Sequence, residues 1–543
     1  MSNPALSDPG LVQDIGWVLA NAREHAADPV LRTAAGFARA GRTTVHRAQV
    51  GRWESGETGA SYRLVRRYEN VLGLPNGQLL RAIDFLGRER HKVSAVPVLA
   101  PALTDSWLED TDALIERALS TAPMSGVDWD NLSAMLGAHP DTLLRSSDWG
   151  DLMMRCSQET AVHVGLEFAQ RHEALIRLAG HPRSGKVVVE LAATVLADPT
   201  TQIFSEAVDL LQHTHHPLGV PLLLGALDSS PAEAALWTVL YTLTTMVDSG
   251  RVTLEDRMRA GTHALDLLRQ DQPVRIHRAA ADLLRAVDPP TRHRIVSALH
   301  ADSRSRIATI VLGGSARLDT EAARLAARIE GRLQDTIGVG ARWAPQLRRL
   351  ISRTTSVTHD DARGNALAVL MLSPQGPAVG DAYAAELRRA LAQGQRVLAD
   401  DALSVLSWLL QPGDIPTLLD LVVDPAGEVV PAMQAAIAIG NCRPGAAAMW
   451  RQQPDRRSVV DRDEICSRVF ASARLRIPTP GADPRSTARG HCYLLGMASR
   501  TDLLGEIILS ARQHAEAGCA GAAEWVMAAQ WWHDRPEWAR PIH

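Results

Sequence analysis

From about residue 105 onward, apolar segments with helical spacing alternate with short breaks rich in proline, glycine, aspartate and histidine. The stretch 400–440 shows this pattern clearly, because its apolar residues read as helix, turn, helix, turn, helix. Several breaks place Pro directly after Asp or Ser, at 287–290, 372–374 and 423–425. The Asp or Ser caps the next helix, and Pro occupies its first turn. Proline is tolerated there because a backbone N–H in the first turn has no acceptor within the helix. The sequence therefore predicts an all-α fold.

Neighbouring segments of this region resemble one another. HPRSGKVVVELAATVLADP, at 181–199, is followed by HHPLGVPLLLGALDSSP, in which Pro217 lies 35 residues after Pro182. A helix pair of this size has too little surface to close its own core, so successive pairs must stack. Aromatic residues are only 4% of the chain, which favours cores of Ala, Leu and Val. These units resemble HEAT-type helical repeats; the resemblance implies an α-solenoid, with an irregular helical bundle as the alternative.

Positive charge is concentrated towards the N-terminus. Residues 1–92 hold 13 basic and 9 acidic residues, a net charge of +4, whereas the remaining 44 basic and 52 acidic residues give −8. Between residues 31 and 67, eight arginines stand against two acidic residues. A basic patch on an acidic body is typical of a DNA-binding head whose other domain does not bind nucleic acid. A solvated basic face is the simpler alternative.

Only two of the 57 basic residues are lysines, which indicates a GC-rich bacterial genome.

The first 90 residues predict a compact bundle of five short helices. Four of them are expected at 14–25, 30–40, 62–72 and 77–87, with Ser61 capping the third of these and Gly73 ending it. The remaining helix lies between 45 and 59. The apolar residues at 91–104 do not follow helical spacing, and two prolines occur there, so we expect a linker.

The helix at 45–59 lies in the stretch VHRAQVGRWESGETG. Val50 and Trp53 share one helical face, which we expect to be buried, with Val45 at the turn before it. Gly56 ends the helix, since glycine readily takes the left-handed conformation found there. The outward side carries Arg47, Gln49 and Arg52. Because Arg can bond guanine and Gln adenine in the major groove, the pattern predicts a DNA-reading helix; a protein-binding or dimerising module is the alternative.

The stretch at 45–59 is followed by a predicted helix at 62–72 and then by Leu-Gly-Leu-Pro. Over about residues 11–87 this order resembles the helix-turn-helix of the Cro and phage-repressor (XRE) type. The resemblance implies that the helix in 45–59 is the recognition helix. The residues to which it assigns base or phosphate contact are Arg42, Thr43, His46, Arg47, Gln49, Arg52 and Arg63. One departure stands out: 17 positions separate Gly36 from Trp53, fewer than in the family pattern. Either the second helix is short or the turn at 42–44 is remodelled.

Other candidate sites are weaker. GHPRSGKV, at 180–187, matches the start of a phosphate-binding loop, but a helical segment precedes it and valine follows the lysine, which favours a turn between helices. The histidines at 213, 215 and 216 have no Cys or acidic residue at ligand spacing. A group near the C-terminus comprises His491, Cys492, Trp531, Trp532 and His533. We expect its tryptophans to cap the end of the repeat core. The sequence thus indicates no catalytic residues, no cofactor and no metal, and predicts a protein that is not an enzyme.

The five cysteines are scattered and never spaced as CxxC, so they indicate neither a disulfide framework nor a zinc finger. No apolar run is long enough to span a bilayer, and the first ten residues lack the basic start and apolar run of a signal peptide. We therefore expect a cytoplasmic protein that does not contact a membrane.

These observations together predict three parts: a helix-turn-helix DNA-binding domain at 11–90, a linker at 91–104, and a HEAT-like ligand- or partner-binding and dimerisation domain at 105–543. The predicted function is sequence-specific transcriptional regulation, in which a homodimer binds a palindromic double-stranded operator. The body would sense a peptide, a small effector or a partner protein, by analogy of architecture with peptide-pheromone receptors. The alternatives are an interaction scaffold with a DNA-tethering head and a HEAT-repeat nucleic-acid enzyme; the body's negative charge counts against the enzyme.

Overall fold

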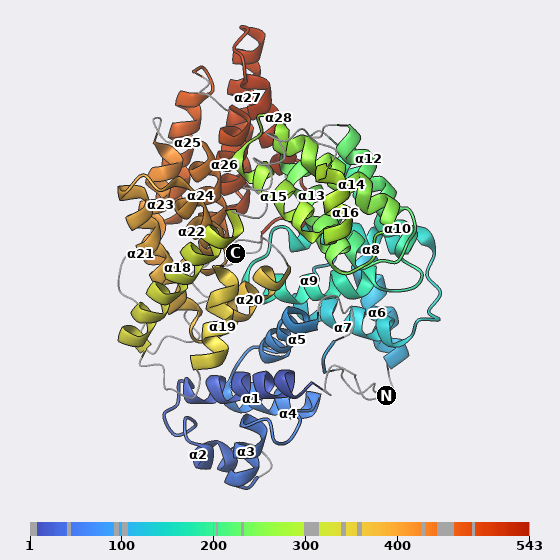
Figure 1. Cartoon of the computed structure of the whole chain (residues 1–543), viewed down its shortest axis with the longest axis vertical. Helices are drawn as coiled ribbons and strands as arrows, with labels where there is room; N and C mark the ends of the chain where they lie inside the picture. The colour runs from blue at the N-terminus through green and yellow to red at the C-terminus, as the bar shows by residue number, and fades with distance from the viewer. Residues whose placement is uncertain are drawn as a thin grey trace.

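The computed structural model describes residues 8–40, 45–91, 97–99, 107–198, 200–201, 205–229, 233–297, 314–337, 344–355, 361–424, 429–442, 461–479 and 484–541. These residues form helices and, within the described ranges, no strand, which confirms the predicted all-α fold. None of the described helices is both long and apolar enough to cross a membrane. Figure 1 shows a small group of helices at one end, which we call the head, below a larger body.

The head contains five helices: α1 (Pro9–Glu24), α2 (Ala34–Arg39), α3 (Arg47–Glu54), α4 (Tyr62–Leu72) and α5 (Gln78–His91). The predicted ends of α4 are confirmed, because the Ser61 side chain accepts a hydrogen bond from the Leu64 amide and Gly73 has a φ of 67°. The second helix is shorter than the predicted segment 30–40, since Thr33 caps its N-terminus and only six residues follow in the helix. Most of the missing residues precede Gly36, so this shortness does not by itself account for the reduced spacing between Gly36 and Trp53.

The first half of the body packs its helices in two rows, which we call the first stack. One row runs through α6, α8, α10, α12, α14 and α16, and the other through α7, α9, η2, α13 and α15. The bounds are α6 (Trp107–Leu119), α7 (Gly126–Ala138), α8 (Ser146–Thr160), α9 (Gly165–Ala179), α10 (Gly185–Ala197), α11 (Ser205–Val208), η2 (Asp209–Gln212), α12 (Gly219–Asp228), α13 (Glu233–Asp248), α14 (Leu254–Arg269), α15 (Val274–Ala286) and α16 (Pro289–Ser297).

The second half of the body repeats this arrangement, and we call it the second stack. Its rows run through α20, α22, α24, α26 and α28 and through α23, α25 and α27. The bounds are α18 (Gly314–Ile337), α19 (Ala344–Thr354), α20 (Asp361–Met371), α21 (Gly376–Ala392), α22 (Arg396–Leu409), η4 (Pro412–Asp414), α23 (Ile415–Val423), α24 (Val429–Asn441), α25 (Arg462–Arg476), α26 (Pro484–Met497), α27 (Thr501–Glu516), α28 (Ala522–His533) and η5 (Glu537–Ala539).

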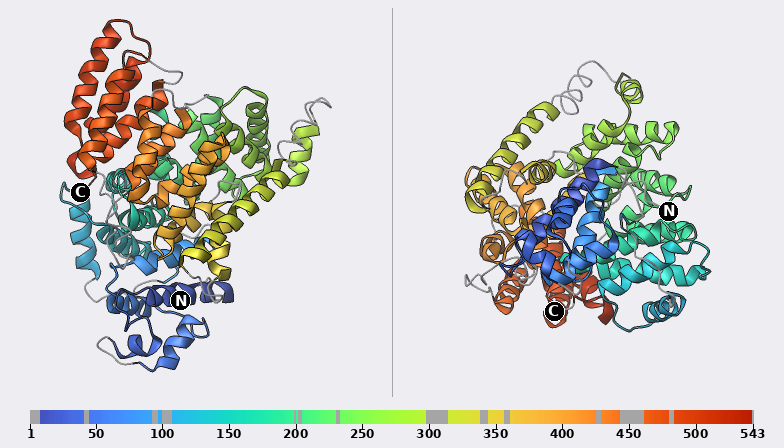
Figure 2. Two further views of the ribbon diagram at one scale, coloured as in Figure 1. Left: turned by 90° about the vertical axis from the view of Figure 1, so that its left-hand side faces the viewer. Right: turned by 90° about the horizontal axis from the view of Figure 1, so that it is seen from below.

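The two stacks face each other and are joined by polar contacts along their length. The Tyr241 hydroxyl of α13 donates to Asp361 of α20 at 2.7 Å. Further along, the Arg489 guanidinium of α26 donates to the Thr201 carbonyl at 3.1 Å. Seen from below, the head lies across both stacks (Figure 2). Most of the hydrophobic core of the first stack forms a cluster of its own, whereas that of the second stack is continuous with the core of the head.

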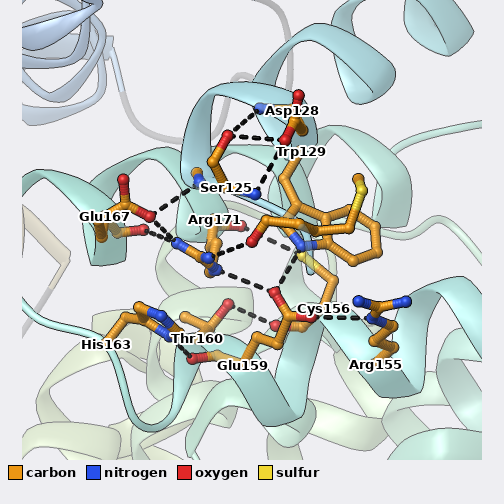
Figure 3. Close-up of polar contacts among 12 residues, drawn as sticks. Ser125, Asp128, Trp129, Arg155, Cys156, Glu159, Thr160, His163, Glu167 and Arg171 are labelled. Atoms are coloured by element: carbon orange, nitrogen blue, oxygen red, sulfur yellow. Dashed lines mark hydrogen bonds and ion pairs between the residues drawn. The ribbon is translucent and has the colours of Figure 1, made fainter. Parts of the chain in front are cut away.

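A buried carboxylate fixes the helices of the first stack that lie nearest the head (Figure 3). Glu159 of α8 is 2% exposed and accepts hydrogen bonds from Arg155, from Arg171 of α9 and from the indole of Trp129 of α7, at 2.8, 3.2 and 2.8 Å respectively. Arg171 is itself fully buried and also donates to the Met124 carbonyl. Because a buried charge is tolerated only when it is paired and hydrogen-bonded, this network holds α7, α8 and α9 in one arrangement.

Helix α5 is buried from residue 78 to residue 89 on every side, because the head packs against both stacks around it. Towards the first stack, Arg81 pairs with Asp130 of α7 at 2.8 Å and Arg88 donates to Glu173 of α9 at 2.9 Å. Towards the second stack, Glu89 accepts from Arg353 of α19 at 3.0 Å. The described part of the expected linker, 97–99, is also packed, with Val98 and Leu99 buried. The head is therefore joined to the body through α5.

Buried histidines make the stability of this fold dependent on pH. Burial lowers the pKa of His491 in α26 to about 4, and its ring nitrogens lie 2.9 Å from the Thr487 carbonyl and 3.1 Å from the Ser472 hydroxyl. An unfolded chain protonates a histidine near pH 6.5, so between about pH 6.5 and 4 the unfolded state binds one more proton at this residue. This contribution to stability is present above pH 6.5 and is lost as the pH falls.

We expect the free energy of unfolding to decrease by about 2 kcal/mol for His491 alone when the pH is lowered from 8 to 5. Urea denaturation followed by circular dichroism at the two pH values measures the decrease. The variant His491→Gln should be less stable at pH 8 but show a smaller decrease, whereas His293→Gln, at an exposed position, should behave as the parent protein does. An unchanged pH dependence in His491→Gln would contradict the assignment.

Candidate nucleic-acid interface

Helix α3 lies at the tip of the head, on the side away from both stacks (Figure 1). Its inner face is held by Val50, which is fully buried, while Val45 and Trp53 are half-buried against the same core. Below them the rings of Phe37 in α2 and Tyr68 in α4 pack with centroids 4.3 Å apart. Of the two residues predicted for the buried face, Val50 is fully buried, whereas Trp53 is only half-buried at the edge of the core.

A buried ion pair fixes the orientation of α3. Glu54 at its C-terminus is 4% exposed and accepts two hydrogen bonds from Arg23 of α1, from Nε at 2.6 Å and from Nη2 at 2.8 Å. The Tyr68 hydroxyl donates to the same carboxylate at 3.0 Å, and burial together with this carboxylate raises the pKa of Tyr68. The sequence pattern does not identify Arg23 as this partner, since 31 residues separate it from Glu54. Three helices are joined at this one carboxylate.

Gly56 ends the helix as predicted, with a φ of 77°. A Cβ at this position would lie 3.0 Å from the Cα of Gln13 in α1, so the turn also requires a small residue for its close approach to α1. The end of α3 is therefore set by backbone conformation and by packing together.

The outer face of α3 is exposed and combines long basic with small side chains. Arg47 and Arg52 are exposed. Between them lie Ala48 and Gly51, whose small side chains project little from the helix backbone. A Cβ added to Gly51 would meet nothing within 4 Å, which means that its backbone faces open space. Small residues flanked by arginines allow a helix to approach a groove closely while guanidinium groups reach the bases and phosphates on either side.

Two predicted contact residues also take part in local structure. The ring Nδ1 of His46 accepts the Ala48 amide at 3.3 Å and so caps the N-terminus of α3, which leaves Nε2 directed outward as the donor. Gln49 is half-buried, and its side-chain oxygen accepts from Nη2 of Arg52 at 2.5 Å. This bond orients Arg52 along the helix and leaves the amide group of Gln49 as a donor.

The arginines of the basic segment 31–67 divide into two groups. Arg32, Arg66 and Arg67 are half-buried and bonded within the head; Arg67, for example, donates to the Ala40 carbonyl at the end of α2 at 3.1 Å. The exposed arginines are Arg39, Arg47, Arg52 and Arg63. Arg39 was not among the predicted contact residues, although the count of basic residues in this segment included it. Arg42 and Thr43 lie outside the described residues.

The weaker candidate sites of the body lie within ordinary packing. The segment 180–187 joins two helices, and Lys186 is exposed and paired with Glu190 at 3.3 Å, so the strand that precedes a phosphate-binding loop is replaced by α9. Among the described residues, no group of three or more His, Cys, Asp or Glu residues is placed to hold a metal ion. His491 and Trp532 are buried in the α26–α28 core, where Trp532 packs edge-on against Tyr493.

Comparison with known proteins does not assign this chain to a family. No protein-family model matches this chain, and no curated protein matches it either.

Removal of the Glu54 charge tests the role of the buried pair. We expect Glu54→Gln to destabilise the head by up to about 3–5 kcal/mol. Arg23 would lose its buried counter-charge and keep only the more exposed Glu24, 3.1 Å away. Hydrogen-exchange mass spectrometry of peptides from α3 and α4 should show faster exchange, and peptides from α26–α28 should be unchanged. Glu57→Gln, an exposed neutralisation three residues further on, is the matched control. Equal exchange in the two variants would show that the pair does not support α3.

Proposed function

We propose that this protein is a sequence-specific DNA-binding transcriptional regulator of the XRE type, whose helical-repeat body senses a ligand. The observation that carries the proposal is the division of α3 into two faces. Val50 and Glu54 hold it to the head, while Arg47 and Arg52 are exposed at the tip of the molecule. A helix presented in this way, flanked by the exposed Arg63 of α4, has the features needed to enter a major groove.

The phosphate backbone would supply much of the affinity. Arginines on α2, α3 and α4 are exposed in the head, and acidic Glu57 is the exposed counter-charge nearest to α3 in sequence. Each phosphate neutralised by a cation releases condensed counterions, so the binding constant falls steeply with salt concentration. Base contacts by Arg47 and Gln49 would then select among sequences to which the head binds with similar electrostatic energy.

The body is proposed to be a HEAT-like α-solenoid in two stacks, and the two-row packing of alternate helices supports this interpretation. Contacts between the stacks and α5 give a physical route by which a change in the body could reorient the head. A homodimer is proposed because heads of this type meet two half-sites of a palindrome about one helical turn apart. With α3 free at the tip, the body is the larger surface on which two chains could associate.

The base contacts are tested with the double variant Arg47→Ala/Gln49→Ala. Selection of DNA from a random pool with the intact protein gives the cognate sequence, and gel shifts on it measure the affinity. We expect the variant to bind this sequence no better than random DNA, since each bidentate contact discriminates by about 1–3 kcal/mol. Its thermal unfolding should be unchanged, because both side chains lie outside the core of the head.

The matched control is Arg145→Ala/Gln513→Ala, which removes the same two residue types from exposed positions on the body. It should bind as the parent protein does. If Arg47→Ala/Gln49→Ala binds the selected sequence with the affinity of the parent protein, α3 is not the reading helix. If the intact protein selects no sequence, the scaffold alternative is preferred.

Arg63 is proposed to contact phosphate rather than a base. We expect Arg63→Ala to weaken binding to cognate and random DNA by similar factors and to reduce the slope of log K against log salt by about 1. Titrations from low to moderate salt by fluorescence anisotropy measure both quantities. A loss confined to the cognate sequence, with the slope unchanged, would instead place Arg63 at a base.

A further inference from the structure

A cavity of about 390 Å³ lies between the two stacks. Its walls come from α13 and α15 on one side and from α22 and α24 on the other. Pockets for small organic ligands in proteins usually measure about 300–1,000 Å³, so the cavity is large enough for a molecule with one or two rings. The stacks meet next to it through Arg278 of α15, which donates to both oxygens of Asp401 in α22 at 2.8 and 3.3 Å.

Aromatic side chains form the wall on the first stack. Trp237 and Tyr241 lie one turn apart on α13, with ring centroids 5.4 Å apart and planes inclined by 18°. Tyr241 is held by the hydrogen bond to Asp361 described above, so the wall has a fixed shape. From the second stack, the side chain of Val397 faces the same cavity. These groups offer flat apolar surface from both sides.

Arg275 of α15 is the distinctive polar group of the cavity. Its guanidinium lies over the face of Trp237, 4.1 Å from the ring centroid. Within the described ranges it makes no side-chain hydrogen bond and has no carboxylate within 4 Å, in contrast to Arg278 beside it. Burial lowers the pKa of Arg275 to about 10, and the nearby Glu233 and Asp400 offset part of this effect, so the group is a cation at neutral pH.

Arg275 has N–H donors available for a ligand, because its guanidinium contacts the Trp237 ring and makes no side-chain hydrogen bond in the described part of the chain. A cation–π contact uses the flat face of the guanidinium, whereas a carboxylate is bound by its edge through two parallel hydrogen bonds. The lining also contains four acidic residues against three arginines, so a ligand with several negative charges would be repelled. These residues are Glu233, Asp282, Asp400, Asp401, Arg275, Arg278 and Arg396. A single carboxylate fits this balance better than a phosphate.

We propose that this cavity binds a small aromatic monocarboxylate, whose carboxylate is bound by Arg275 and whose ring contacts Trp237, Tyr241 and Val397. The inference deepens the ligand-sensing part of the proposed function and rests on it. A ligand in this position contacts both stacks, and both stacks also contact α5. Its recognition needs neither a metal nor a covalent step.

The test is isothermal titration calorimetry of the full chain with 2-naphthoate as the probe, in the absence of DNA. We expect saturable binding of one molecule per chain, and binding at least about tenfold weaker for the uncharged 2-naphthamide, since a charge-assisted pair of hydrogen bonds is lost. Arg275→Gln should weaken 2-naphthoate binding by a similar factor. Arg269→Gln, an exposed arginine on α14, is the matched control and should bind as the parent protein does.

Val397→Asp provides a second variant that leaves Arg275 unchanged. Val397 is 42% exposed, so the substitution is compatible with folding, and its charge should repel the carboxylate and weaken binding at least about tenfold. Absence of saturable binding, equal affinity for the amide, or unchanged affinity in both variants would overturn the proposal. Since no DNA is present, these outcomes are independent of the gel shifts with Arg47→Ala/Gln49→Ala, and failure of the cavity is distinguishable from failure of the DNA-binding role.

Discussion

The position of the head depends on the pairing of charges around α5. Arg81, Arg88 and Glu89 lose almost all contact with water where the head meets the two stacks, and each faces an opposite charge on a different helix of the body. Removing the partner of a buried charge costs about 3–5 kcal/mol where no other counter-charge is near. Apolar contacts alone would allow α5 to slide or rotate, whereas directional ion pairs permit one register. The direction in which α3 points follows from that register.

The same principle acts at a smaller scale inside the head. Glu54 joins α1, α3 and α4 through Arg23 and Tyr68, so the helix expected to meet DNA is fixed by a polar contact at one end and by Val50 in its middle. Asp130 of α7 shows how such groups are kept charged. Burial raises its pKa, but Arg81 and Arg177 together hold the pKa below its usual value. Charged residues thus define geometry throughout this molecule, and the apolar residues supply most of the driving force.

The sequence predicted features whose causes are local. The ends of α4 follow from Ser61 and Gly73, and the buried position of Val50 follows from helical spacing, so all three could be deduced within a window of a few residues. The pairing of Arg23 with Glu54 and the full burial of α5 depend on contacts between distant segments, which periodicity does not encode. Segment 77–87 was expected to complete a separate bundle, and its charged residues gave no indication that they face Asp130 or Glu173. The cavity could not be predicted from the sequence either, because Trp237, Arg275 and Val397 come from three helices on two stacks.

The contrast between α3 and α5 has a consequence for how this protein can change over evolutionary time. The outer side chains of α3 contact little of the protein, so substitutions there have little effect on folding. Substitutions in α5 must be accepted together with compensating changes on two other parts of the chain. Under the proposed DNA-binding role, a lineage of such proteins is free to acquire new target sequences. It can rarely exchange its head for another, because a head from another protein lacks the partners of the charges on α7, α9 and α19.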